Sequence, residues 1–141
     1  MYKLDFAFLV SLGIDPNVID PKNIRIYGNG GLILPEENGL FRYDDLEENA
    51  ITVVGESDNV FNTTDYVMFY GKGITRWDVK NDPSKKGVVF IPVRNFYSDT
   101  SFYYVNVDLG PGKRVTSQNS LSSPNVSTST YDYYNLSLIH I

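Results

Sequence analysis

Apolar and polar residues alternate along several short stretches of this chain, with the two-residue period of β-strands. The clearest case is residues 23–27, where Ile24 and Ile26 fall on one face. Residues 2–4 are predicted to be the end of another strand, and further strands are predicted over residues 50–54, 66–70, 88–93 and 102–107. Because these strands are short and separated by turns, the predicted fold is mostly β and β-sandwich-like, with one or two short helices near the N-terminus.

Two of these segments also carry information about their place in a sheet. Residues 66–70 are apolar on both faces, which is typical of a strand in the centre of a sheet. Pro92 has no backbone N–H, so residues 88–93 are expected to form an edge strand or a bulge.

A short helix is predicted over residues 6–12. Asp5 is suited to be its N-cap, and Gly13 is suited to end it. Three apolar side chains are expected to share the buried face of this helix: Phe8, Leu9 and Leu12.

Other local signals predict turns and one further helix start. The Asp-Pro steps at residues 15–16 and 20–21 are each expected to cap a single turn. Three glycines and Asn29 over residues 28–31 predict a turn that uses positive φ angles. The acidic residues 44–48 have the Asp-x-x-Glu spacing of a capping box, so a helix is expected to begin there.

The composition fits one globular domain and argues against several classes of function. The chain has 141 residues, of which 42% are hydrophobic, enough to bury a core. Its formal net charge is −5 and its lysines and arginines are scattered, so nucleic acid is not an expected partner. No apolar run is long enough to predict a transmembrane segment. The absence of cysteine removes disulfides, thiolate metal ligands and a cysteine nucleophile.

Residue usage changes along the chain and predicts three parts. Residues 1–115 are expected to form the β-rich domain. Residues 116–135 are rich in Ser, Thr and Asn, which is typical of a linker or a surface excursion. Residues 136–141 differ again and are interpreted as a non-native tail. At the other end, Met1 is followed by no basic signal-peptide start, so we expect it to be an internal position.

Catalytic candidates are few. The single histidine, His140, lies in the tail, so a Ser-His-Asp triad, a Cys-His pair and a histidine zinc site are not expected. The carboxylates over residues 44–48 are too close together for the separated pair of a glycosidase, and helix capping is the preferred interpretation. Gly28-x-Gly30 and Gly71-x-Gly73 complete neither a dinucleotide-binding motif nor a P-loop, so both are interpreted as turns.

The segment 56–65 contains the one candidate metal site. If Asp65 is the last position of a twelve-residue calcium loop, Asn62 and Asp58 fall at oxygen-ligand positions of that loop. Asn59, however, stands where such loops carry glycine, and the first position falls on an apolar residue. Two interpretations therefore stay open: a weak calcium site formed by Asp58, Asn62 and Asp65, and the preferred one, a plain hairpin loop without a cofactor.

Three aromatic residues are candidates for a sugar-stacking surface. Trp77, Tyr70 and Tyr43 have the flat, amphipathic rings that stack on sugars. Aromatic residues near strand ends also cover hydrophobic cores, and this is the preferred interpretation.

Five phrases follow one another over most of residues 2–115. They are YKLDFAFLVSLGID; IDPKNIRIYGNGG followed by LPEEN; RYDDLEENAITVVGESD; DYVMFYGKG followed by Trp77; and NFYSDTSFYYVNVDLGPGKRV. In this order they resemble the N-terminal region of the PorU family, the gingipain-type cysteine endopeptidases of the type IX secretion system in Bacteroidota.

The resemblance implies a parent protein at the cell surface, on the outer membrane, that cleaves the C-terminal sorting signal from secreted cargo in a sortase-like step. In that family the catalytic Cys and His belong to a caspase-like domain that follows this region, and no position of this chain matches them. The chain is therefore expected to be a non-catalytic N-terminal fragment, inactive alone, whose partners are that peptidase domain and other secretion components. The rival hypothesis is an autonomous carbohydrate- or calcium-binding surface module.

Overall fold

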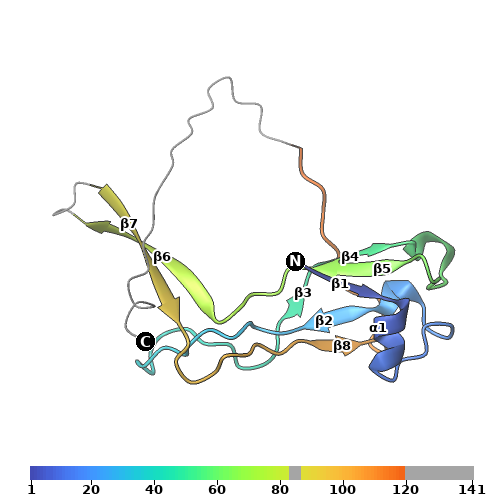
Figure 1. Ribbon diagram of the computed structural model, residues 1–141, viewed down its shortest axis with the longest axis horizontal. Helices are drawn as coiled ribbons and strands as arrows, with labels where there is room; N and C mark the ends of the chain where they lie inside the picture. The colour runs from blue at the N-terminus through green and yellow to red at the C-terminus, as the bar shows by residue number, and fades with distance from the viewer. Residues whose placement is uncertain (83–86, 120–141) are drawn as a thin grey trace, which may run out of the picture.

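The computed structural model describes residues 1–82 and 87–119, and these form mostly β-structure, as predicted. Figure 1 shows two small sheets packed together at one end of the molecule and a two-stranded hairpin extending from them at the other. Most of the predicted linker 116–135, the predicted tail 136–141 and His140 lie outside the described residues.

The first sheet has three antiparallel strands: β1 (Tyr2–Asp5), β5 (Tyr66–Phe69) and β4 (Ile51–Val54), in that order. Val67 of β5 lies opposite Leu4 on one side and Val53 on the other. The central position predicted for the strand that is apolar on both faces is therefore confirmed.

The second sheet also has three antiparallel strands: β3 (Glu48–Asn49), β2 (Arg25–Tyr27) and β8 (Tyr104–Asn106), in that order. Only Ala50 separates β3 from β4, so one nearly continuous stretch contributes a strand to each sheet. The helix predicted to begin at residues 44–48 is wrong. The Asn29 side chain accepts a hydrogen bond from the Glu47 N–H at 2.7 Å and donates one to the Asp45 carbonyl at 2.9 Å, which holds this segment extended.

The hydrophobic core lies between the two sheets. Ile26 of β2 and Ile24, directly before this strand, are fully buried, as the alternating pattern predicted, and Val67 faces the core from the first sheet. Burial of such a side chain stabilises the fold by about 1.5–3 kcal/mol. The buried hydrophobic residues are Leu4, Leu9, Ile24, Ile26, Ile51, Val53, Phe61, Val67 and Phe69.

The first helix, α1 (Phe6–Ser11), begins at the predicted residue and ends one residue before the predicted end, with Leu12 as its C-cap. The Asp5 carboxylate accepts a hydrogen bond from the Phe8 N–H at 2.9 Å, and Gly13 takes a positive φ of 81°. The predicted buried face is wrong, because only Leu9 is buried, whereas Phe8 is 45% and Leu12 49% exposed. The helix contacts the core along one row of side chains, and Phe8 and Leu12 form the neighbouring row.

Two 3-10 turns occupy loops, one between α1 and β2 and one between two strands. In η1 (Pro21–Asn23), the Asp20 side chain caps the turn by accepting a hydrogen bond from the Lys22 N–H at 2.9 Å, as predicted for this Asp-Pro step. The other, η2 (Glu56–Asp58), lies in the connection between β4 and β5.

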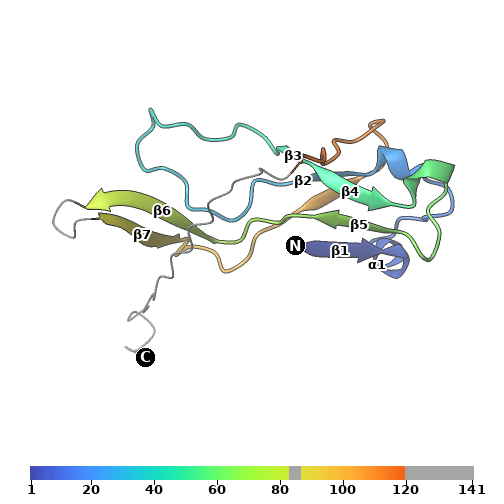
Figure 2. The ribbon, with the colours of Figure 1, turned by 90° about the horizontal axis from the view of Figure 1, so that it is seen from above.

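The hairpin consists of β6 (Thr75–Asp82) and β7 (Gly87–Arg94), which pair antiparallel over their full length. Figure 2 shows it leading away from the two sheets. β7 contains the predicted strand with Pro92, and in the part of the chain that the structure describes it pairs with β6 alone, which confirms the predicted edge position. β6 was missed by the sequence analysis, although its charged residues alternate with single apolar ones in the two-residue period of a β-strand.

The two sheets are joined on one side and separated on the other. On the joined side, residues 113–115 run along the edge of β4, where the Ile51 N–H donates to the Lys113 carbonyl at 3.0 Å and the Val115 N–H to the Ile51 carbonyl at 2.9 Å. On the other side, β1 and β8 are each the edge strand of their sheet within the described part of the chain.

Candidate functional site

A groove opens on the side of the molecule where β1 and β8 are edge strands. We call it the β1–β8 groove, and its volume is about 320 Å³. This lies near the lower end of the range of small-ligand sites, about 300–1,000 Å³. Its apolar and aromatic lining consists of Tyr2, Leu4, Phe8, Leu12, Phe69 and Tyr103.

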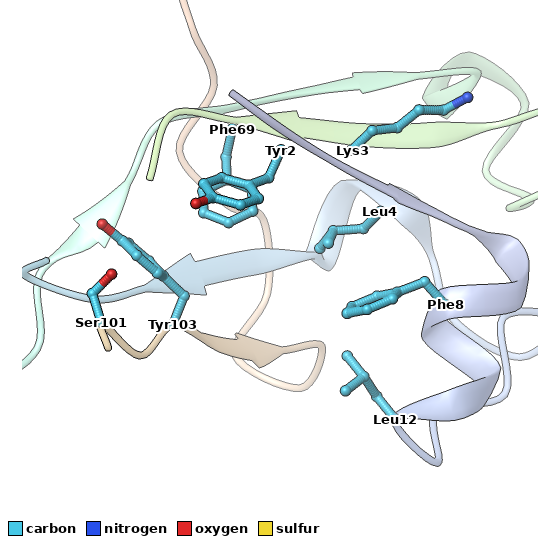
Figure 3. A pocket seen from close by; sticks show the side chains of 8 residues that line it. All are labelled: Tyr2, Lys3, Leu4, Phe8, Leu12, Phe69, Ser101 and Tyr103. Carbon is cyan, nitrogen blue, oxygen red and sulfur yellow. The ribbon is translucent and has the colours of Figure 1, made fainter. Parts of the chain in front are cut away.

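One wall of the groove comes from β1 and α1. Figure 3 shows Phe8 and Leu12 side by side on the helix, below Leu4 of β1. Residues four positions apart on a helix lie on the same face, so the exposed row that the core leaves uncovered becomes this wall. The two side chains that the sequence analysis expected in the core therefore line the groove instead.

The remaining lining is aromatic and comes from distant parts of the chain. The rings of Tyr2 and Phe69 are stacked with centroids 5.4 Å apart and an interplanar angle of 26°. The Tyr103 ring lies 5.2 Å from that of Phe69, tilted by 58°. Gly71 allows this arrangement, since a Cβ there would lie 2.8 Å from the Tyr2 ring.

Two hydroxyl groups of the groove lining, those of Tyr103 and Ser101, are already hydrogen-bonded to the backbone. The Tyr103 hydroxyl accepts a hydrogen bond from the Lys72 N–H and donates one to the Lys72 carbonyl at 3.0 Å. The Ser101 hydroxyl donates to the same carbonyl at 3.1 Å. Burial raises the pKa of Tyr103 above its ordinary value, and the backbone hydrogen bond to Lys72 offsets this only in part. These groups are fixed and neutral.

Among the described residues that line the groove, Lys3 is the one that carries a charge. Its ammonium lies 4.4 Å from the centroid of the Tyr66 ring, a cation–π contact, and Figure 3 shows the side chain directed away from Phe8 and Leu12. The described lining includes no carboxylate, imidazole or thiol. The groove can therefore bind an apolar or aromatic group, and its described lining offers no acid–base pair or nucleophile for catalysis.

The sequence analysis did not find this site. Phe8 and Leu12 were expected to be buried, and Tyr2, Phe69 and Tyr103 come from three segments that meet only in the folded chain. The only local signal was the shortness of the predicted helix, since a short helix has few side chains that the core can bury.

The predicted calcium residues lie in the connection between β4 and β5. Asp65 is buried, and its carboxylate accepts hydrogen bonds from the Asn62 N–H at 2.7 Å and the Thr64 hydroxyl at 3.4 Å. Asp58 accepts one from the Val60 N–H at 3.1 Å and one from the Asn62 side chain at 3.2 Å. The described residues include no group of three or more His, Cys, Asp or Glu side chains that could hold a metal. The calcium site stays a prediction.

Other candidates occupy ordinary structural positions. The aromatic residues proposed for sugar stacking lie on separate segments: Trp77 on β6 opposite Pro92, Tyr70 just after β5, and Tyr43 beside Phe41 with ring centroids 5.2 Å apart. Their role in sugar binding stays a prediction. None of the described helices is long and apolar enough to cross a membrane.

Comparison with protein-family models, with curated proteins and with solved structures gave no match for this chain.

Proposed function

We propose that this chain is a non-catalytic docking domain from the N-terminal part of a PorU-like C-terminal signal peptidase of the type IX secretion system. In this proposal the parent is a gingipain-type cysteine peptidase at the outer membrane, which removes the C-terminal sorting signal from secreted cargo at the cell surface. The present chain holds partners in place, and a caspase-like domain elsewhere in the parent cleaves the peptide bond.

The observation that carries the docking role is the β1–β8 groove. It exposes Phe8 and Leu12 beside two edge strands, and an exposed apolar surface of this kind marks sites of interaction. Its described lining lacks the titratable groups that a hydrolase needs, which favours binding over catalysis. The family assignment within the proposal rests on the five phrases of sequence.

The parent can be tested directly at the level of the gene. We expect the nucleotide sequence downstream of codon 135, read from an uninterrupted contig, to encode a caspase-like domain with a Cys and a His. A gene that ends near this point, with no peptidase downstream, would contradict the family assignment while leaving the docking role open.

The docking role can be tested with the peptidase portion encoded downstream, expressed separately and titrated calorimetrically with this chain. The variant Phe8→Asp/Leu12→Asp is expected to weaken binding at least tenfold, because it places two charges on the apolar wall. Val18→Asp is the matched control, since Val18 is 78% exposed and lies outside the groove lining. Equal binding by the groove variant and the control would refute the groove as the docking site.

A further inference from the structure

The dipeptide Asn-Gly occurs twice in this chain, at Asn29-Gly30 and at Asn38-Gly39. Asparagine before glycine is chemically labile, because glycine has no side chain to hinder attack of its backbone nitrogen on the asparagine amide carbon. Both steps lie in the segment that connects β2 to β3. The local sequence therefore gives the two asparagines a similar intrinsic reactivity, and the fold decides how fast each one reacts.

The fold holds the first of these asparagines, Asn29, in a fixed position. Its side-chain N–H donates to the Asp45 carbonyl at 2.9 Å, and its side-chain oxygen accepts from the Glu47 N–H at 2.7 Å. Gly30 has a φ of 81°, and a Cβ there would lie 2.9 Å from the Cβ of Lys72. Ring closure on the Gly30 nitrogen turns the Asn29 side chain toward its own backbone and expels the amide nitrogen. Both hydrogen bonds are lost in that step, which raises its barrier in the folded chain.

The second asparagine, Asn38, lies in an exposed turn. The Leu40 N–H donates to the Glu37 carbonyl at 3.2 Å, which places Asn38 and Gly39 at the two central positions of the turn. Both residues are exposed, and within the described part of the chain neither the Asn38 side chain nor the Gly39 N–H makes a hydrogen bond. A Cβ built on Gly39 meets no atom within 4 Å, so the space around the attacking nitrogen is open.

We propose that Asn38 is a site of spontaneous hydrolytic deamidation in the folded chain, and that the fold protects Asn29 from the same reaction. The Gly39 nitrogen forms a bond to Cγ of Asn38 and loses its proton. The bond from Cγ to the side-chain nitrogen breaks, and this nitrogen takes up a proton and leaves as ammonia. Water then opens the succinimide ring at either carbonyl, which gives aspartate or isoaspartate at residue 38. Water is the one co-reactant, and no oxidant or reductant takes part.

The reaction changes both the charge and the backbone of this turn. A new carboxylate at residue 38 directly follows Glu36 and Glu37, in a chain whose formal net charge is already −5. Isoaspartate also adds one carbon to the main chain before residue 39. Arg42 donates to the carbonyls of Pro35 and Glu37 at 3.3 Å each, so its guanidinium spans the altered segment. Residues 35–42 contribute neither to the buried core nor to the described lining of the β1–β8 groove, so we expect the core and the groove to stay unchanged.

Incubation of the full chain at mildly alkaline pH, followed by peptide mass spectrometry, measures the conversion of each asparagine. We expect Asn38 to convert at least tenfold faster than Asn29 in the folded chain. In guanidinium chloride, where the hydrogen bonds of Asn29 are lost, the two rates are expected to agree within about threefold. Methylation by an isoaspartate-specific methyltransferase identifies isoaspartate among the products.

Gly39→Ala tests which nitrogen attacks. Gly39 has no positive φ and has space for a methyl group, so the variant is expected to fold as wild type does. Its methyl group hinders the attacking nitrogen, and conversion of Asn38 is expected to slow at least tenfold. Gly73→Ala is the matched control, because it also adds a methyl group in open space, and it should change the rate at Asn38 less than twofold. Circular dichroism checks the fold of both variants.

Three results would overturn the proposal. Equal rates at Asn29 and Asn38 in the folded chain would show that the hydrogen bonds to Asp45 and Glu47 give no protection. Conversion of Asn38 only in the denatured chain would show that the turn itself blocks the reaction. An unchanged rate at Asn38 in Gly39→Ala would exclude attack by the nitrogen of residue 39 and indicate direct hydrolysis of the side-chain amide.

Discussion

Tyr103 connects three parts of the chain through one side chain. Its ring contacts Phe69, its hydroxyl holds the backbone of Lys72, and Gly28 approaches so closely that a Cβ there would lie 2.6 Å from the ring. The resulting burial raises the pKa of Tyr103. Because the neutral phenol is favoured in the folded state, folding and protonation of Tyr103 are linked.

This linkage predicts how stability changes at alkaline pH. The folded-state pKa of Tyr103 is raised, so its stabilising contribution is complete below about pH 10, the unfolded value, and is lost as the pH rises through the folded value. We expect urea unfolding at increasing pH to show a steeper decline in wild type than in Tyr103→Phe. Tyr104→Phe is the control, since Tyr104 is 55% exposed, and it should decline as wild type does. Parallel curves for Tyr103→Phe and wild type would contradict the linkage.

Two arginines hold the loop that follows β8. Arg25 donates to the carbonyls of Leu109 at 2.8 Å, Gly110 at 3.0 Å and Pro111 at 2.9 Å. Arg114 pairs with Glu56 at 2.8 Å and donates to three carbonyls between residues 21 and 24. The planar guanidinium reaches several acceptors at once, which a lysine ammonium cannot do in the same geometry.

Arg114→Lys tests this role. We expect the variant to lower the free energy of unfolding by about 1–3 kcal/mol, because partly buried carbonyls lose their donors. Arg94→Lys is the control, because the Arg94–Asp99 ion pair is exposed and such pairs contribute about 0–1 kcal/mol. Both values come from urea unfolding at neutral pH, and equal effects of the two variants would show that Arg114 acts only as a surface charge.

At the scale of elements, α1 serves both the core and the groove. Leu9 is fully buried, whereas Leu12 is half-exposed in the groove wall. Leu9→Ala is expected to lower the free energy of unfolding by about 2–5 kcal/mol, the usual cost of a core truncation. Leu12→Ala is expected to cost less than about 1 kcal/mol. Thermal and chemical unfolding measure the stability of the two variants. Similar losses of stability would mean that α1 packs on the core through the row of Leu9 and the row of Leu12 alike.

The connection between β4 and β5 is held by its own polar groups. Gly55 has a φ of 98°, and a Cβ there would lie 2.1 Å from an Asp65 carboxylate oxygen. Asp65 in turn accepts a hydrogen bond from the Asn62 N–H at 2.7 Å. The loop thus depends on the absence of a side chain at residue 55.

Gly55→Ala is therefore expected to destabilise the fold by more than about 1 kcal/mol, through backbone strain and displacement of Asp65. Gly39→Ala is the control, because nothing lies within 4 Å of its built Cβ. Chemical unfolding compares the two, and a neutral Gly55→Ala variant would show that the loop readily rearranges.

At the scale of the whole molecule, we expect the hydrophobic core and the hairpin to contribute independently to the free energy of unfolding. Every residue of the buried cluster belongs to the paired sheets, α1 or the loops beside them, and no described hairpin residue joins it. The residues that flank the hairpin, Ile74 and Asn95, are joined by a backbone hydrogen bond, so the two ends of the hairpin lie close together. A short linker can therefore replace the hairpin without spanning a gap.

Replacement of residues 75–94 by two glycines is expected to leave the free energy of unfolding within about 1 kcal/mol of wild type, because no core contact is lost. Urea unfolding and amide hydrogen exchange at Val67 measure this. Leu9→Ala serves as the destabilised reference, and loss of cooperative unfolding in the hairpin deletion would show that the core depends on the hairpin.

Sequence pattern by itself determined the features that depend on near neighbours. The burial of Ile24 and Ile26, the central place of β5, the cap at Asp5 and the edge position of Pro92 all follow from residues a few positions apart. Strand alternation, capping and the missing proline N–H act locally, so they can be inferred from the chain alone.

Only the tertiary structure decided the features that require distant segments to meet. The Asn29 side chain accepts a hydrogen bond from the Glu47 N–H. The acidic segment that predicted a helix start therefore stays extended and leads into the strand β3. The groove forms because Tyr103 and α1 approach from opposite ends of the chain, leaving Phe8 at the surface. The preference of a single residue for helix or strand amounts to a few tenths of a kcal/mol up to about 1 kcal/mol. The free energy of contacts between distant residues is large enough to override this preference.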